Sequence, residues 1–134
     1  MSELFEVRHV TVSIARSADE VYAFASDGAN LPRWASGLGE RATRSSGEWQ
    51  LEGPLGRIRV RFAPVNQFGV LDHQVLLPDG QAVHNPLRVV PNGSGSELSF
   101  VLFRLPGVSS EKFAADAAWV ERDLTRLKAL LEAR

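Results

Sequence analysis

The last quarter of the chain carries one continuous apolar stripe at helical spacing. Its apolar residues recur at alternating intervals of four and three positions: Phe113, Ala117, Val120, Leu124, Leu127 and Leu131. This is the periodicity of one face of an amphipathic α-helix. Ser109 supplies an N-cap hydroxyl, and Val108 and Phe113 form a hydrophobic staple around it. At about 1.5 Å per residue, about 25 helical residues span roughly 38 Å, enough to cross a whole sheet.

The chain before this helix has mostly the alternation of β-strands. Residues 5–14 are expected to form a first strand, and residues 38–105 a series of strands separated by turn residues. Two short helices are expected between them. Ser17 and Glu20 have the spacing of a capping box, and the helix that they begin should end near residues 27–28. A second helical turn is expected at residues 30–34, with Pro32 in its first turn.

A first hairpin can be aligned around a four-residue loop at residues 53–56. The alignment puts opposite charges together on one face and apolar groups on the other. The charged and polar pairs are Glu52 with Arg57, Gln50 with Arg59, and Glu48 with Arg61, and the apolar pairs are Leu51 with Ile58 and Trp49 with Val60. The sequence therefore predicts that Trp49 faces inwards.

A second hairpin turns at Pro78-Asp79-Gly80, where proline and glycine suit a three-residue loop. That register sets Val75 opposite Val83 and Leu71 opposite Leu87. It also places His73 opposite Asn85 on an otherwise apolar face, which makes the two residues the first polar candidates for a site. The residues expected on the other face are Asp72, Gln74 and His84.

Composition removes several classes of function. The chain has no cysteine, which excludes disulfides and thiolate chemistry. Its formal net charge is -1, so no field favours nucleic acid, and Glu48 and Glu52 neutralise the arginines of the first hairpin. The three histidines lack the spacing of a zinc site and no glycine-rich phosphate loop is present, so no metal and no cofactor are expected. No membrane span is expected. The acidic start, residues 1–6, lacks the features of a signal peptide, which favours the cytoplasm.

Three segments carry a resemblance to a known family: Val12–Tyr22, Asn30–Trp34 and Trp119–Leu124. With the order of elements, they make the chain similar to the START-like or Bet v 1-like (SRPBCC) superfamily, in its bacterial polyketide cyclase/dehydrase-type branch. The resemblance implies an α+β helix-grip fold over residues 1–134 as a single domain. In that fold a curved seven-stranded antiparallel sheet wraps around a long C-terminal helix, and two short helices follow the first strand.

The same resemblance implies a cavity between the sheet and the C-terminal helix. Members of the superfamily bind lipids, hormones, polyketides or quinones, and some are cyclases or aromatases. Three hypotheses follow for this chain: binding of an apolar small molecule in the cavity, a polyketide cyclase- or dehydratase-like enzyme, and a protein-interaction module. A homodimer through a strand edge or the helix ends is compatible with the pattern, although no sequence feature supports it.

His73 is the best catalytic candidate, because an imidazole can orient a carbonyl group or move a proton. The alternative is a core histidine bonded to Asn85 or to the backbone. The other candidate ligand-binding residues are aromatic: Trp34, Trp49, Tyr22 and Trp119. The resemblance puts Trp34 at the cavity mouth, while core packing remains open for Trp34 and Trp49. Trp119 lies beside the helix stripe, where it would either close the other end of the cavity or, as we favour, pack into the core. Arg104 would hold a ligand carboxylate if the phase of Leu98 and Leu102 faces inwards; otherwise it is a surface charge.

Overall fold

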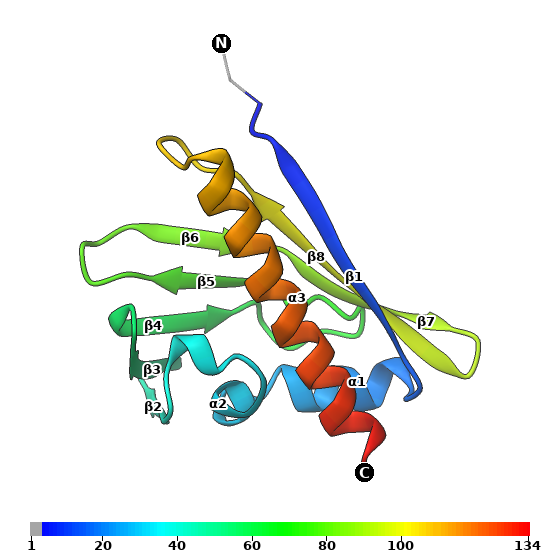
Figure 1. The fold of residues 1–134 in the computed structure, drawn as a ribbon. Coiled ribbons are helices and arrows are strands. Elements are labelled where there is room, and N and C mark those ends of the chain that lie inside the picture. Colours follow the sequence, from blue (N-terminus) through cyan, green and yellow to red (C-terminus); the bar gives the residue numbers. More distant parts are fainter. Residues whose placement is uncertain (1–3) are drawn as a thin grey trace.

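The computed structural model describes residues 4–134, and the first three residues of the acidic start lie outside this range. A long helix lies across one face of curved antiparallel sheets, and two short helices cover the end of that layer (Figure 1). The strands within residues 4–134 are β1 (Val7–Ile14), β2 (Ala42–Ser45), β3 (Glu48–Gly53), β4 (Gly56–Phe62), β5 (His73–Leu76), β6 (Ala82–Asn85), β7 (Leu87–Asn92) and β8 (Gly95–Phe103). The helices are α1 (Ala18–Ala25), α2 (Leu31–Trp34) and α3 (Ser110–Glu132), with 3-10 turns η1 (Gly28–Asn30) and η2 (Ser36–Leu38). The helix-grip expectation is confirmed.

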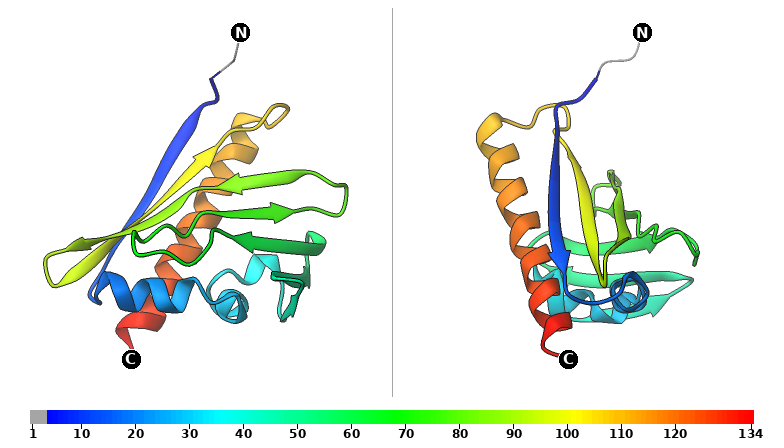
Figure 2. Two further views of the ribbon diagram at one scale, coloured as in Figure 1. Left: turned by 180° about the vertical axis from the view of Figure 1, so that it is seen from behind. Right: turned by 90° about the vertical axis from the view of Figure 1, so that its right-hand side faces the viewer.

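Helix α3 forms as its stripe predicts. The Ser109 hydroxyl caps it by accepting from the Lys112 N–H. The stripe residues Phe113, Ala117, Leu124, Leu127 and Leu131 are all buried. The end of α3 is tied to the end of β1, where Glu132 accepts from the Ala15 N–H at 2.8 Å. The opposite view confirms that α3 runs diagonally across one side of the strands (Figure 2).

The strands are divided between two antiparallel sheets, in the orders β1-β8-β7 and β2-β3-β4-β5-β6. Between β6 and β7 stands a single residue, Pro86, which has no N–H to donate to a neighbouring strand. Strands β6 and β7 are therefore one bent strand, and the expected seven strands are present with this one interrupted. The Leu71 N–H still donates to the Leu87 carbonyl across the bend, so the two sheets remain in contact.

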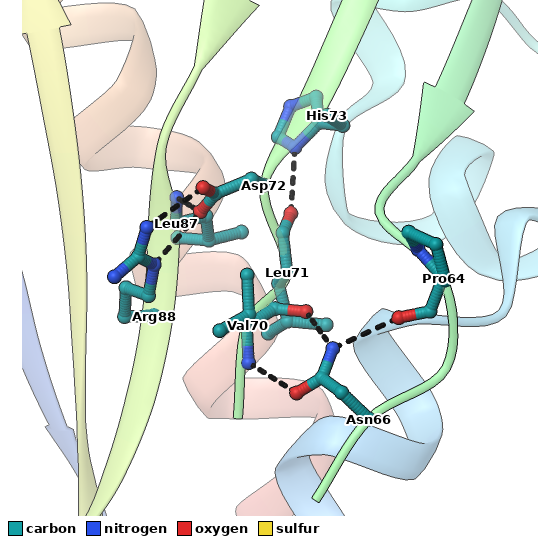
Figure 3. A network of polar contacts seen from close by, with 8 residues as sticks. All are labelled: Pro64, Asn66, Val70, Leu71, Asp72, His73, Leu87 and Arg88. Carbon is teal, nitrogen blue, oxygen red and sulfur yellow. Dashed lines mark hydrogen bonds and ion pairs between the residues drawn. The ribbon is translucent and has the colours of Figure 1, made fainter. Parts of the chain in front are cut away.

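Asp72 closes the gap in the backbone bonding at this bend. The Leu87 N–H donates to its Oδ1 at 2.9 Å, and the Arg88 guanidinium donates to both carboxylate oxygens (Figure 3). Asp72 thus points away from the face that carries His73, as the register predicted. The hydrogen bonds from Arg88 hold the pKa of Asp72 below its ordinary value.

Asp72→Ala should lower the free energy of unfolding by about 2 kcal/mol, because it leaves the Leu87 N–H unpaired and Arg88 without its partner. Arg88→Ala, which keeps the bond to Leu87, should cost about 1 kcal/mol. The contribution of Asp72 is complete above the ordinary aspartate pKa and is lost as the pH falls through the lowered value. Urea unfolding of the three proteins at neutral and acidic pH measures this difference. Equal losses for the two variants would contradict the bridging role.

Both hairpin registers are confirmed. Trp49 pairs with Val60 and Leu51 with Ile58 in the first hairpin, and His73 pairs with Asn85 in the second. On the outer face, Glu48 lies 2.9 Å from Arg59 Nη1 and 2.6 Å from Arg61 Nη2. The inward-facing apolar side of these strands is what α3 covers.

The connection between β4 and β5 is held by Asn66. Its side chain accepts from the Val70 N–H and donates to the carbonyl groups of Pro64 and Val70 (Figure 3). It also accepts from the Phe68 N–H. Its own N–H donates to the Tyr22 hydroxyl at 3.0 Å. Tyr22 therefore fastens helix α1 to this loop.

Candidate functional site

A hollow of about 420 Å³ lies between the sheets and α3, within the usual size range of small-molecule sites. Its walls come from α2 and η2, the β3–β4 turn, strands β5, β6 and β8, and one side of α3. The lining residues that carry the argument are His73, Val83, Asn85, Trp34, Trp119 and Asp123. Most of the remaining lining residues are apolar. The side chains therefore leave an apolar space with a few polar groups in its walls.

His73 contributes a hydrogen-bond acceptor to this space. It is 6% exposed, and its Nδ1 lies 3.0 Å from the Leu71 carbonyl oxygen (Figure 3). A carbonyl group only accepts, so Nδ1 carries the proton and Nε2 carries a lone pair. Burial lowers the pKa of His73 and so favours the neutral ring, while the hydrogen bond to the Leu71 carbonyl opposes this shift. Of the alternatives left open for His73, the backbone bond is the one that forms.

Asn85 adds a second polar group to this part of the wall. It stands opposite His73 on β6, and its amide makes no side-chain hydrogen bond within residues 4–134. The Trp34 indole N–H also lacks an acceptor there, but this nitrogen is fully buried and has no surface on the cavity. A ligand could therefore bond to the Asn85 amide, and not to the indole.

Asp123 is a candidate site residue that was not among those expected from the sequence. It lies on α3, lines the cavity and is half-buried. Burial raises its pKa to about 7, against the opposing effect of neighbouring Arg122. No hydrogen bond to another part of residues 4–134 stabilises its charge. At neutral pH this carboxyl is thus divided between its charged and neutral forms, facing an apolar space.

A signal for Asp123 is present in the sequence. Lys112, Asp116, Trp119 and Asp123 each precede a residue of the apolar stripe by one position. They form a second row along the same helix, at intervals of four, three and four residues. All four line the cavity. A stripe flanked by a mixed row of polar and aromatic residues therefore marked which side of α3 faces the hollow.

The tryptophans occupy different places from those expected. Trp34 is 4% exposed, because α2 packs against α3, so it forms part of the wall and not of the mouth. Trp119 is 47% exposed and Leu55 is 50% exposed, and both line the cavity at its rim. Trp119 lies against Gly37 of η2, with Arg122 stacked 4.5 Å from its ring. Core packing, the favoured interpretation of Trp119, is therefore wrong.

Three other candidates lie outside the cavity lining. Trp49 faces inwards as predicted but is half-buried against Gly28. The Tyr22 hydroxyl is occupied by Asn66. For Arg104, Leu98 and Leu102 do face inwards, but β8 ends at Phe103 and the chain turns. Its guanidinium then donates to the Val108 carbonyl and to Glu6, and not to the cavity.

Asp123→Asn should stabilise the protein at about pH 8 by about 1 kcal/mol, well below the full pKa difference because the carboxyl is partly exposed. In the wild type, the folded state keeps a proton that the unfolded chain releases near its ordinary pKa. Its stability therefore falls as the pH rises from about 4 to about 7. The variant should lack this component. Urea unfolding across that range tests it, with Glu121→Gln, an exposed carboxyl on α3, as the control. Parallel stability curves for wild type and Asp123→Asn would refute the raised pKa.

Among residues 4–134, no group of three or more histidine, cysteine, aspartate or glutamate side chains is arranged to hold a metal ion. Within the same range, no helix is both long and apolar enough to cross a membrane.

Comparison with solved structures finds the same fold in several proteins. An uncharacterised protein from Bacillus thuringiensis aligns with a TM-score of 0.74 at 15% identity, covering 94% of this chain and 98% of its own. A START superfamily protein from Mycobacterium smegmatis aligns at 0.69 and 16% identity, covering 95% and 97%. Norcoclaurine synthase from Thalictrum flavum, in truncated form, aligns at 0.65 and 16% identity, covering 98% and 96%. At these identities the likeness shows the fold alone.

Comparison with curated proteins finds no match. A family profile does match, over residues 7–132, which is nearly all of the chain. Its description is polyketide cyclase / dehydrase and lipid transport. The match and the helix-grip fold agree with the START-like and Bet v 1-like resemblance carried by the sequence. The chain belongs to the polyketide cyclase / dehydrase and lipid transport family.

Proposed function

We propose that the protein binds an apolar small molecule, such as a lipid or a polyketide, in the cavity between its sheets and α3. The observation that carries the proposal is a hollow of about 420 Å³ with mainly apolar walls and unpaired polar groups. In a core built only for stability, such a space would be filled and such groups would be paired. A cytoplasmic location and a homodimer stay predictions.

Polar anchors are essential to this proposal. Burying about 300 Å² of apolar ligand surface would gain roughly 7 kcal/mol, while association costs on the order of 4–15 kcal/mol. Apolar contact alone is therefore marginal. His73 Nε2 and the Asn85 amide supply the groups that would orient a ligand and add the missing affinity.

The test uses 2-methylnaphthalene as an apolar probe in equilibrium dialysis. We expect saturable binding of one probe per chain, and Val83→Trp should weaken it by at least about tenfold. Val83 lies in the cavity wall, and a larger side chain there extends into the hollow. Ala82→Trp is the matched control, because Ala82 is exposed on the opposite face of the same strand. Native mass spectrometry after organic extraction adds a second readout. No saturable binding, together with no co-purifying molecule, would refute the proposal.

Proton transfer is a second candidate function, favoured by the presence of both His73 and Asp123 in the wall. Burial lowers the pKa of the histidine and raises that of the aspartate to about 7. At neutral pH His73 is therefore a neutral base and Asp123 a partly protonated acid. This pair suits general acid–base chemistry on a carbonyl compound. They lie on different walls, β5 and α3, so a substrate would lie between them.

Exchange of the α-protons of 2-tetralone in heavy water, followed by NMR, distinguishes the two functions. An enzyme of this kind should accelerate exchange over buffer, and His73→Gln and Asp123→Asn should each reduce the acceleration by at least about tenfold. An exchange rate equal to that of buffer would leave binding as the proposed function.

A further inference from the structure

Two polar groups of the cavity lining, on different walls, are hydrogen-bond acceptors when Asp123 is charged. On β5, His73 offers Nε2 alone, because its Nδ1–H is used by the Leu71 carbonyl. On α3, Asp123 offers a carboxyl group without a hydrogen bond within residues 4–134. Asn85 can either accept or donate. A ligand that bonds to both His73 and charged Asp123 must therefore bring a hydrogen-bond donor.

The cavity wall provides little positive charge for an anionic ligand. Among the described residues that line it, the cationic side chain is Lys112. Its Nζ lies 2.5 Å from Asp116 Oδ1, so its charge is already matched, and the Lys112 side chain is 63% exposed at the rim. Arg122 stacks on the ring of Trp119 and is exposed. A ligand carboxylate that entered the hollow would meet Asp123, while the described lining residues offer no unmatched cation.

We propose that Asp123 makes this cavity selective for neutral ligands that carry a hydroxyl group, and against ligands that carry a carboxylate. The inference rests on the proposed binding function and assigns the ligand class. A hydroxyl group would donate to His73 Nε2 or to Asp123. A carboxylate has no hydrogen to donate to His73 Nε2, and its charge would be repelled by Asp123 more strongly in an apolar space than in water. The inference thus separates alcohols and phenols from fatty-acid-like ligands.

The test compares two probes with the same ring system, 2-naphthalenemethanol and 2-naphthoate, in equilibrium dialysis at about pH 8.5, where Asp123 is mainly charged. We expect the wild type to bind the alcohol at least about tenfold more tightly than the carboxylate. An apolar cavity disfavours any carboxylate to some degree, so the variants carry the decision. Asp123→Asn should strengthen 2-naphthoate binding by at least about fivefold and change alcohol binding by less than about twofold.

Two further variants exclude indirect effects. Asp123→Glu keeps the charge and should keep the discrimination. Glu121→Gln removes an exposed carboxyl from the same helix, outside the cavity lining, and should leave both affinities unchanged. Equal affinities of the wild type for the two probes, or an unchanged ratio in Asp123→Asn, would overturn the inference even if 2-methylnaphthalene binds. Failure of all three probes to bind would instead overturn the proposed function, and with it the inference.

Discussion

Truncating Leu127 to alanine should lower the free energy of unfolding by about 3–5 kcal/mol, whereas the same truncation at Leu124 should cost only about 2–3 kcal/mol. Leu127 is 0% exposed and Leu124 is 1% exposed, so burial alone would predict equal losses. The difference is that Leu124 lines the cavity, and Leu127 does not. Side chains beside the hollow can relax into the space that truncation of Leu124 leaves, so this loss should be smaller.

The comparison is controlled by the helix itself. Both residues lie in the interior of α3, where alanine and leucine have similar helix propensities, so that contribution cancels. Urea unfolding with a shared slope gives the two losses directly. Equal losses would mean that Leu124 is packed as tightly as Leu127. That result would contradict the place of Leu124 in the cavity wall.

The helices, strands and hairpin registers could be predicted because each follows from a local pattern, whereas the helix-grip arrangement was expected from the family resemblance. The stripe that ends at Leu131 is readable because helical spacing depends on neighbours three and four positions away. The hairpin registers are readable because one alignment pairs Glu52 with Arg57 and another pairs Val75 with Val83. The break at Pro86 is local too, but its consequence is not. Asp72 accepts from the Leu87 N–H at a separation of 15 positions. This bond emerges only when β5 and β6 lie side by side.

The site was harder to predict because a cavity is a property of several elements together. His73 and Asn85 could be found, since a hairpin register fixes which face they occupy. Asp123 could not be ranked in the same way, because its neighbours across the hollow lie on strands far away in the sequence. Tyr22 shows the same limit, since its hydroxyl is occupied by Asn66, at a separation of 44 positions. Local patterns give the direction of a side chain, and the packing of distant elements decides what it meets.

Gly28→Ala should lower the free energy of unfolding by about 2–3 kcal/mol, because the new methyl group overlaps with Trp49. A Cβ at this position would lie 2.2 Å from Trp49 Cδ1 and 2.3 Å from Cγ. The indole cannot move away easily, since it packs against the core and Arg44 lies over its ring. Urea unfolding of Gly28→Ala, of Trp49→Leu and of the double variant should therefore show a favourable coupling of at least about 1 kcal/mol.

Gly37→Ala is the matched control, with a Cβ that would lie 2.4 Å from Trp119 Cζ2. Trp119 is exposed at the cavity rim and can swing outwards, so this variant should cost less than about 1 kcal/mol. The effects on binding should be reversed. Folded Gly28→Ala should bind 2-methylnaphthalene as the wild type does, because Trp49 is outside the cavity lining, while Gly37→Ala displaces a rim residue and should change the affinity by at least about threefold. Equal losses of stability in the two variants, or a binding defect confined to Gly28→Ala, would contradict the roles assigned to Trp49 in the core and Trp119 at the cavity rim.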